Sequence, residues 1–273
     1  MRHVESVKQH DKLLEREVQF HDDRSHDIDL DKLCPKLLFE GSTCPENRFI
    51  MKHIGDLQNK RVLELGCGAG EASVYLATKG AKCLASDCSP GMLHIAKKLA
   101  KTHNVEIETQ ALDSMDINAD DNSFDIVYAA NILHHTDHIR TLQEIHRVLK
   151  PGGKGCFWDP LKHNPIINIY RRMATEVRSD DEHPLNINVV HDINKIFSTE
   201  VHDTFWYSTL WLFLRFYLIE HVHPNEEAYW KKIIYEENRL RPMYKRLARF
   251  DELIKRIPFL RRYAWNIAIV ATK

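Results

Sequence analysis

The sequence lacks the features that would place it in a membrane or a secretory compartment. It has no long uninterrupted apolar run, its mean hydropathy is −0.43, and charges are spread through its first twenty residues. The six cysteines form no Cys-x-x-Cys pair, so we expect reduced thiols. These absences predict a cytoplasmic chain with neither a signal peptide nor a transmembrane segment.

Two other classes of protein are disfavoured by what is missing. Cys34, Cys44, His21 and His26 follow no metal-binding template, so we expect no metal site. Lys and Arg total 38 against 39 Asp and Glu, which excludes a global basic field and argues against a nucleic-acid partner. Residues 231–273 alone carry a net charge of +8, from twelve basic and four acidic residues. This segment is either a solvated helical face or a surface for an anionic lipid or substrate.

The first 58 residues show helical rather than strand periodicity. Apolar residues at helical spacing predict a helix over residues 4–20, which the polar run 21–31 should interrupt. A second helix is predicted from Pro45 to Asp56, because proline is tolerated in the first turn. We expect residues 1–58 to form a helical lid over the remaining domain, residues 59–273.

From residue 61 onward, short apolar runs alternate with helical stretches. Such alternation predicts a parallel sheet covered by helices on both faces. The final run is apolar and β-branched, so we expect it inside the sheet rather than at its edge. The predicted strands are 61–65, 81–87, 105–111, 124–130, 154–159, 201–213 and 264–272.

Two segments interrupt this rhythm after Pro160. Residues 161–195 and 215–262 read as helical insertions that would form the site of a second substrate. The aromatic run 205–219 is too short to span a membrane. It either packs as a sixth strand followed by a buried helix, or it forms an apolar wall for a hydrophobic substrate.

A glycine-rich loop, Gly66, Gly68 and Gly70, follows the first predicted strand. Its Gly-x-Gly-x-Gly spacing differs from the Gly-x-Gly-x-x-Gly of dinucleotide-binding loops. Glu64 and Glu71 flank the loop, where two carboxylates would repel a phosphate and favour a sulfonium or ammonium group. A simple tight turn is the alternative.

Asp87 ends the second predicted strand, 21 residues after Gly66. An acidic side chain at this position can accept hydrogen bonds from both ribose hydroxyls of an adenosine. It can equally cap the helix that begins at Ser89-Pro90.

Four motifs in order give the chain a resemblance to the class I S-adenosylmethionine-dependent methyltransferases, in the small-molecule branch that includes quinone biosynthesis. The motifs are VLELGCGAG (62–70), SDCSPGML (86–93), LDSMDINADDNSFDIVYAANILHH (112–135) and LKPGG (149–153). The resemblance implies an α/β, Rossmann-like sheet of seven mostly parallel strands with an antiparallel last strand.

The resemblance also assigns S-adenosylmethionine contacts, with S-adenosylhomocysteine as the product. The three loop glycines would admit the methionine moiety, Glu64 would shape the loop, and Asp87 would hold the ribose. Around the adenine it implies Cys88 and Met92 at the flanks, Asp113 at the amino group with Ser114 beside it, and Asn131 beneath. Cys67 and Cys88 occupy variable motif positions, so neither is expected to be a catalytic thiol.

The methyl acceptor is less constrained by the sequence. His134, His135, Asp159 and His163 follow the fourth and fifth predicted strands, where they could act on an acceptor proton. Shaping the loop is the alternative role for the histidines, and capping the next helix is the alternative for Asp159.

The resulting hypothesis is methyl transfer from S-adenosylmethionine to a small molecule. The acceptor could be hydrophobic, such as a quinone, an isoprenoid, a lipid or a natural product, and residues 205–262 could contact a membrane peripherally. An RNA or protein methyltransferase and a non-catalytic S-adenosylmethionine sensor are the alternatives. The sequence does not specify an oligomeric state.

Overall fold

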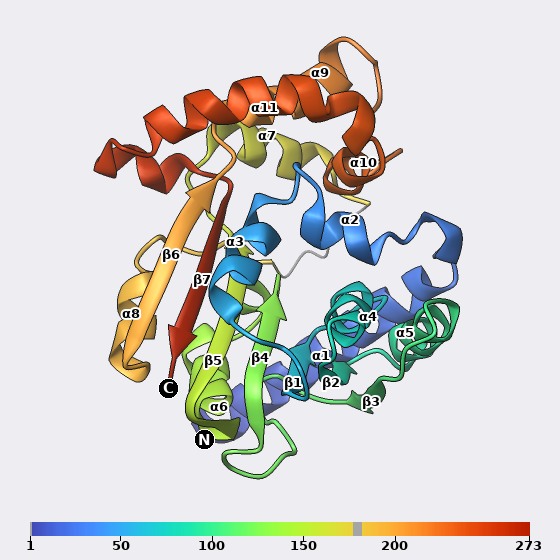
Figure 1. Cartoon of the computed structure of the whole chain (residues 1–273), viewed down its shortest axis with the longest axis vertical. Coiled ribbons are helices and arrows are strands. Elements are labelled where there is room, and N and C mark those ends of the chain that lie inside the picture. The colour runs from blue at the N-terminus through green and yellow to red at the C-terminus, as the bar shows by residue number, and fades with distance from the viewer. Residues whose placement is uncertain (1, 177–181) are drawn as a thin grey trace.

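A seven-stranded sheet forms the centre of the computed structural model, which describes residues 2–176 and 182–273 and, before residue 14, the backbone only (Figure 1). The strand order is β3-β2-β1-β4-β5-β7-β6. The strands are β1 (Arg61–Leu65), β2 (Lys82–Asp87), β3 (Glu108–Ala111), β4 (Phe124–Ala130), β5 (Leu149–Pro160), β6 (Thr199–Phe205) and β7 (Asn266–Thr272).

The strand directions confirm the predicted topology. Strands β1 to β5 pair in parallel, whereas β7 is antiparallel to both of its neighbours, β5 and β6. β7 therefore lies inside the sheet, as its continuous apolar sequence predicted, and six of its seven residues are buried. The chain forms the Rossmann-like α/β fold with an antiparallel last strand.

Helices cover both faces of the sheet, and the apolar layers beneath them form the main core of the molecule. Leu63, Val127 and Ile269 point to the face under α6 and α8. Val62, Ile126 and Val270, the neighbours of those residues in sequence, point to the face under α2, α3 and α4. The helices before the sixth strand are α1 (Arg2–Ser25), α2 (Pro35–Glu40), α3 (Pro45–Ile54), α4 (Glu71–Thr78), α5 (Pro90–Thr102), α6 (His138–Val148), α7 (Pro165–Met173) and α8 (Val189–Ile196).

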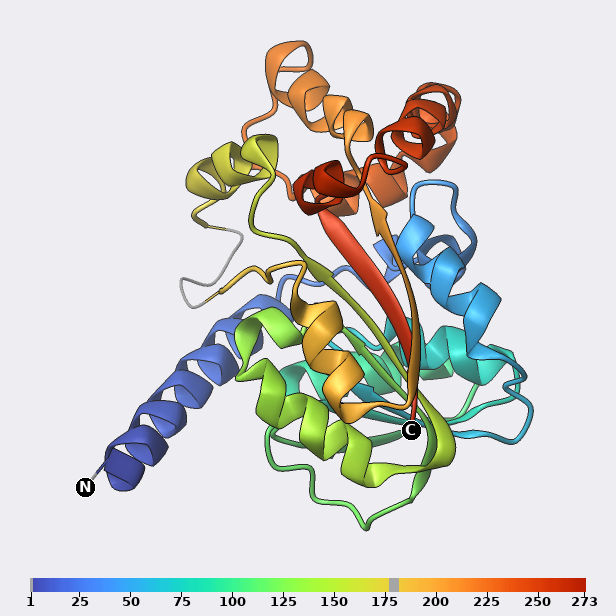
Figure 2. The ribbon, with the colours of Figure 1, turned by 90° about the vertical axis from the view of Figure 1, so that its left-hand side faces the viewer.

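A second apolar core lies above the sheet, at the edge where β4 and β6 end (Figures 1 and 2). We call its helices α7, α9, α10 and α11 the helical cap. They correspond to the insertions predicted after the fifth strand and between the last two strands. The three helices between β6 and β7 are α9 (Trp211–Leu218), α10 (Tyr229–Tyr235) and α11 (Glu237–Ile254).

One buried carboxylate fastens the cap to the sheet. Asp251 of α11 accepts hydrogen bonds from the backbone N–H groups of Tyr207 at 3.1 Å and Ser208 at 2.6 Å. The hydroxyls of Ser208 and Thr209 each donate to it at 2.6 Å. The chain leaving β6 is therefore turned into α9 by a residue more than forty positions away.

The predicted strand within 201–213 was too long for this reason. β6 ends at Phe205, because Trp206 adopts a φ of +69° and the next N–H groups bond to Asp251. Trp206, Phe213 and Phe216 are buried in the second core, whereas Trp211 and residues 217–219 are exposed. Packing is therefore confirmed for one part of the aromatic run only.

Other boundaries also differ from the predictions. α1 continues through the first part of the polar run and ends at Ser25, and the short helix α2 was not predicted. β3 begins at Glu108 rather than at residue 105, because Val105 returns its N–H to Ala100 at the end of α5. Of the predicted helical segment 161–195, the structure forms α7 and most of α8, and residues 177–181 lie outside the described residues.

Gly70 provides a test of the packing between α4 and α5. Its φ is +81°, and a Cβ atom added there would lie 2.5 Å from the Cβ of Ala96. We expect Gly70→Ala to lower the free energy of unfolding by about 1–3 kcal/mol, through backbone strain and overpacking. Denaturant unfolding measures this change.

Ala96→Gly, alone and combined with Gly70→Ala, completes a double-mutant cycle for this contact. Removing the Ala96 methyl should recover part of the loss in the double variant. Strictly additive changes would show that the two residues do not compete for the same space.

Candidate functional site

The glycine loop and Asp87 meet where the strand order reverses. β1 and its neighbours β2 and β4 end together there, which is where open α/β sheets bind ligands. Asp87 accepts the Gly68 N–H at 2.8 Å and the Ser89 N–H at 2.9 Å. One carboxylate thus joins the loop after β1 to Ser89, the residue that caps α5. The predicted hydrogen bonds from Asp87 to a ribose stay a prediction.

The loop glycines differ in what surrounds them. All three have positive φ, but a Cβ at Gly66 would lie 2.0 Å from the Ile132 side chain, and Gly70 is closed by Ala96. A Cβ at Gly68 would meet no atom within 4 Å. Gly68 therefore presents an uncovered stretch of backbone that a ligand could approach closely.

Glu64 lies beneath the loop rather than in it. It is buried, and it accepts both the N–H and the hydroxyl of Ser73 in the first turn of α4, at 2.7 and 2.5 Å. Burial raises the pKa of Glu64 to about 8, and the negative charges of Asp87 and Glu71 add to this. Its predicted role in shaping the loop matches these contacts.

The two carboxyls that flank the loop repel a phosphate less than the sequence suggested. Glu71 accepts the Cys34 N–H at 2.9 Å, and burial raises the pKa of its carboxyl as well. A raised pKa favours the neutral form, so the site does not present two full negative charges to a ligand.

Cys67 and Cys88 have the properties of structural thiols. Burial raises the pKa of Cys67 well above its ordinary value, and it raises that of Cys88 to about 12. Neither thiol is poised to form the reactive thiolate. Met92 is buried in the first turn of α5, where its N–H donates to the Ser89 hydroxyl.

The residues assigned to the adenine lie after β3 and β4. Asp113 accepts the Met115 N–H at 2.9 Å in a tight turn that also contains the half-buried Ser114. Asn131 is exposed, has a φ of +56°, and donates its N–H to Trp158 of β5. Both turns follow strands that border β1 or β2, so these residues and Asp87 are at the same edge of the sheet.

The N-terminal helix contributes to this edge through residues that the sequence did not single out. Asp22 of α1 accepts the Gly91 N–H at 2.9 Å and also the Ser89 hydroxyl. These hydrogen bonds lower the pKa of Asp22, the one to Ser89 most. Helix α1 is thus fixed against the N-terminus of α5, although helical periodicity alone gave no indication of its docking site.

His134 and Asp159 form a buried pair at the ends of β4 and β5. Asp159 Oδ1 lies 2.8 Å from His134 Nδ1 and 3.2 Å from its backbone nitrogen. Burial raises the pKa of Asp159 to about 8, although the His134 N–H opposes the shift. Asp159 Oδ2 is buried without a hydrogen-bond partner among the described residues.

His135 extends this pair toward the N-terminal helix. Its Nδ1 lies 3.7 Å from Glu17 of α1, and its ring centroid is 4.1 Å from that of His134. Among the residues described, His134, His135 and Glu182 are the one group whose possible metal-ligand atoms lie within 4.8 Å of one another. The cysteines and histidines considered for a metal from the sequence, Cys34, Cys44, His21 and His26, form no such group.

His163 lies in different surroundings from the other three candidates. Burial lowers its pKa, and the positive charges of Lys162 and Arg262 lower it further. No hydrogen bond joins it to Asp159 or to either histidine in the described part of the chain. The structure therefore groups three of the four predicted catalytic residues and leaves His163 beside the helix that precedes β7.

Two basic residues near the loop were missed by the sequence reading. Burial lowers the pKa of Lys231 in α10, and the charge of Arg24 lowers it further, whereas Glu71 raises it. Burial also lowers the pKa of Arg24. The charges of α10 in the cap, the end of α1 and the start of α4 are therefore close enough to affect one another. Their spacing in the sequence gives no indication of this.

The middle of the chain matches a known protein family. Residues 62–153 match the family model described as a methyltransferase domain. The match contains the glycine loop, Asp87, Asp113, Asn131 and the paired histidines, but it ends before Asp159.

Curated relatives agree over the same part of the chain. A ubiquinone biosynthesis O-methyltransferase of Coxiella burnetii is 31% identical over 121 residues, 44% of this chain and 51% of that protein. A demethylmenaquinone methyltransferase of Lactococcus lactis is 32% identical over 161 residues, 57% of this chain and 60% of that protein. The chain thus spans about half the length of the curated relatives it matches.

Solved structures share the fold at low identity. The phosphoethanolamine N-methyltransferase 2 of Haemonchus contortus, in complex with S-adenosyl-L-methionine, gives a TM-score of 0.56 at 20% identity, covering 84% of this chain and 52% of its own. The [4+2]-cyclase SpnF gives 0.54 at 16% identity, covering 85% and 80%. At these identities the likeness concerns the fold alone.

Asp87→Ala tests the organisation of the loop. We expect it to weaken S-adenosylmethionine binding more than tenfold, because charge-assisted hydrogen bonds contribute roughly 1.5–3 kcal/mol each. Calorimetric titration measures the affinity, and a thermal melt shows whether the variant is folded. Asp87→Asn, which keeps the shape, is the matched control for charge, and wild-type affinity in Asp87→Ala would refute the assignment.

Proposed function

We propose that this chain, whose residues 62–153 form a methyltransferase domain of the class I S-adenosylmethionine-dependent type, transfers a methyl group to a small-molecule acceptor. The observation that carries the proposal is the position of the His134–Asp159 pair, at the same edge of the sheet as the glycine loop and Asp87. This position supports a role for the pair as proton acceptor beside the proposed cofactor site.

The cofactor site needs little chemistry of its own. A sulfonium methyl is already an activated electrophile, so the protein mainly has to align a nucleophile with it and exclude water. Such alignment is worth roughly 7–11 kcal/mol in well-oriented systems. In this proposal the uncovered backbone at Gly68 admits the methionine end, and Asp87 holds the ribose.

The His134–Asp159 pair would remove the acceptor's proton. When Asp159 is ionised, it would accept a hydrogen bond from His134 Nδ1–H and so favour the tautomer whose basic nitrogen is Nε2. A carboxylate behind an imidazole also stabilises the imidazolium that forms when the ring takes up a proton. This arrangement suits a hydroxyl or carbon acid, which must lose a proton when it is methylated.

The acceptor is proposed to be hydrophobic, of the quinone, isoprenoid, lipid or natural-product type. Two curated relatives carry names from quinone metabolism, and the aromatic second core lies in the cap above the sheet. The near-neutral overall charge speaks against an RNA acceptor. A protein acceptor and a non-catalytic sensor are the remaining alternatives, and the cyclase SpnF illustrates that the fold alone does not specify methyl transfer.

Helix α1 would act as a lid in this reaction. Asp22 connects α1 to the start of α5, and Glu17 lies beside His135, so the helix touches both the cofactor side and the proton-accepting side. Closure of such an element sequesters the reactants from water. We extend this role to residues 1–58, as the sequence suggested.

Release of S-adenosylhomocysteine is the direct assay of the proposed function. We expect release with pools of hydroxylated aromatic or prenylated acceptors and none with tRNA or peptide pools. Cofactor binding without release in any pool would favour a sensor, and release with tRNA alone would overturn the small-molecule acceptor.

The same assay can separate a general base from a metal centre at His134, His135 and Glu182. A hydrogen-bonded base needs no cation, so turnover should survive dialysis against a chelator. A loss that returns with added divalent cation would instead identify the histidines as ligands.

Asp159→Asn tests the pair directly. It should leave S-adenosylmethionine affinity unchanged and lower kcat by about 10²-fold, because a general base contributes roughly 10²–10⁴-fold. The wild-type kcat should rise with pH through about 8, since below that value the raised pKa keeps Asp159 protonated. The variant should lack this rise.

His163→Ala is the control, since His163 lies outside the pair. Equal losses of affinity and turnover in Asp159→Asn would place Asp159 in the cofactor site instead. An unchanged pH profile in that variant would remove Asp159 from the proton transfer.

A further inference from the structure

Exposed apolar side chains concentrate in the part of the chain that follows β6. Of the thirteen large apolar residues that are exposed among those described, eleven lie between Trp211 and Tyr263. Four of them follow one another around the end of α11: Phe250 and Leu253, with 58% and 56% of their surface exposed, and Ile257 and Phe259, with 43% and 63%. We call these four residues the docking patch.

Two residues of the docking patch share one helical face, and the other two follow directly after the helix. Phe250 and Leu253 are three positions apart on α11, which ends at Ile254. Ile257 lies in the turn after α11, and Phe259 lies in the short 3₁₀ helix Pro258–Tyr263. Scattered single apolar residues are normal on a protein surface, but several close together in the chain are typical of an interaction site.

Basic side chains surround the docking patch. The two acidic residues of the same stretch do not balance them, because Asp251 is buried in its hydrogen bonds and Glu252 pairs with Lys255 at 2.6 Å. In the described structure, none of the exposed basic residues makes an ion pair with a carboxylate. They are Lys245, Arg246, Arg249, Arg256, Arg261 and Arg262.

A second set of exposed apolar side chains lies at the opposite end of the cap. The start of α9 is held to the end of α11 by Thr209 and Asp251, and the segment after α9 is held to the start of α11 by Glu220 and Arg239. Residues 217–219, with exposed fractions of 43–60%, stand at the end of α9 and therefore lie near the start of α11, away from the docking patch.

We infer that the docking patch binds the surface of an anionic lipid bilayer. Apolar side chains at this position can insert at the level of the lipid headgroups while the surrounding arginines and lysines pair with anionic lipids. No helix in the described residues is long and apolar enough to span a membrane, so the contact is a peripheral one.

Charge argues against a second copy of the chain as the occupant. A two-fold contact through this patch would place the six exposed cations of one copy against the same six of the other. Like charges at such an interface repel, whereas an anionic bilayer offers the complementary sign. Charge complementarity together with the exposed apolar side chains favours the lipid surface.

The patch is connected to the proposed active site through the cap. Helix α10 packs against α9 and α11, and its Lys231 lies within electrostatic reach of Arg24 and Glu71 beside the glycine loop. If the proposed function holds, the lipid contact would deliver a membrane-dissolved acceptor to that site. The lipid contact itself does not depend on the proposed function.

Vesicle co-sedimentation of the full chain tests the inference. With vesicles of phosphatidylcholine containing one third phosphatidylglycerol, we expect binding at least about tenfold tighter than with phosphatidylcholine alone, and weaker binding as salt increases. Arg249→Glu combined with Arg256→Glu should reduce binding to the level of neutral vesicles. Leu253→Ser combined with Phe259→Ser should reduce binding at low and high salt alike.

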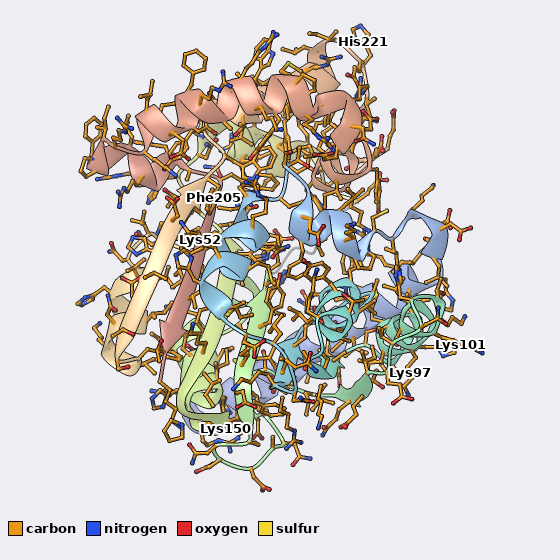
Figure 3. All side chains as sticks on the ribbon, viewed as in Figure 1. Lys52, Lys97, Lys101, Lys150, Phe205 and His221 are labelled. Atoms are coloured by element: carbon orange, nitrogen blue, oxygen red, sulfur yellow. The ribbon has the colours of Figure 1, made fainter. Side chains whose placement is uncertain are left out.

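Lys97→Glu combined with Lys101→Glu is the matched control. These exposed lysines lie on α5, far from α11, and their replacement makes the same change in net charge (Figure 3). The control should bind anionic vesicles with an affinity within about twofold of the wild type, since its lower net charge alone weakens binding only slightly. Calorimetric S-adenosylmethionine binding by every variant verifies that each is folded.

Three results would overturn the inference. The first is equal binding to anionic and neutral vesicles, and the second is an equal loss in the α5 control. The third combines two observations: the wild type sediments as a dimer that substitutions in the patch dissociate, and neither the wild type nor any variant binds vesicles. Vesicle binding without methyl release would leave the lipid contact intact and count against the proposed function alone.

Discussion

Two backbone N–H groups from different segments converge on the carboxylate of Asp87, and the geometry of the site depends on this convergence. Gly68 belongs to the loop after β1, and Ser89 begins the helix after β2. Because Ser89 also bonds to Asp22, the same point fixes α1. The loop, the first two strands and the N-terminal helix are thereby held in one arrangement around a single charged group, which no neutral side chain of similar size could provide.

The sequence predicted those parts of the molecule that depend on local pattern. Strands buried on both faces produce continuous apolar runs, so β1, β4 and β7 could be located from the sequence, and the motifs identified the cofactor end. The misjudged end of β6 depends on Asp251, and the docking of α1 depends on Asp22. Both are contacts between distant segments, which leave no periodic trace.

The pair of His134 and Asp159 is another contact between distant segments that local sequence pattern does not predict. His134 and Asp159 could each be selected because each follows a strand, but their 2.8 Å contact arises only because β4 and β5 are neighbours. Glu17 and Lys231 come from a helix and an insertion with no motif. The fold is shared with proteins whose names describe other reactions, so the fold alone does not specify the chemistry.

The helical cap and the N-terminal helix α1 are held to the rest of the molecule with unequal strength. The cap is held by the buried Asp251 through four hydrogen bonds, whereas α1 is held to α5 through the half-buried Asp22. Local opening follows the least protected contacts first. In the proposed reaction the cap would therefore stay in place beside the acceptor, whereas the N-terminal helix would be the element that opens when cofactor and product exchange.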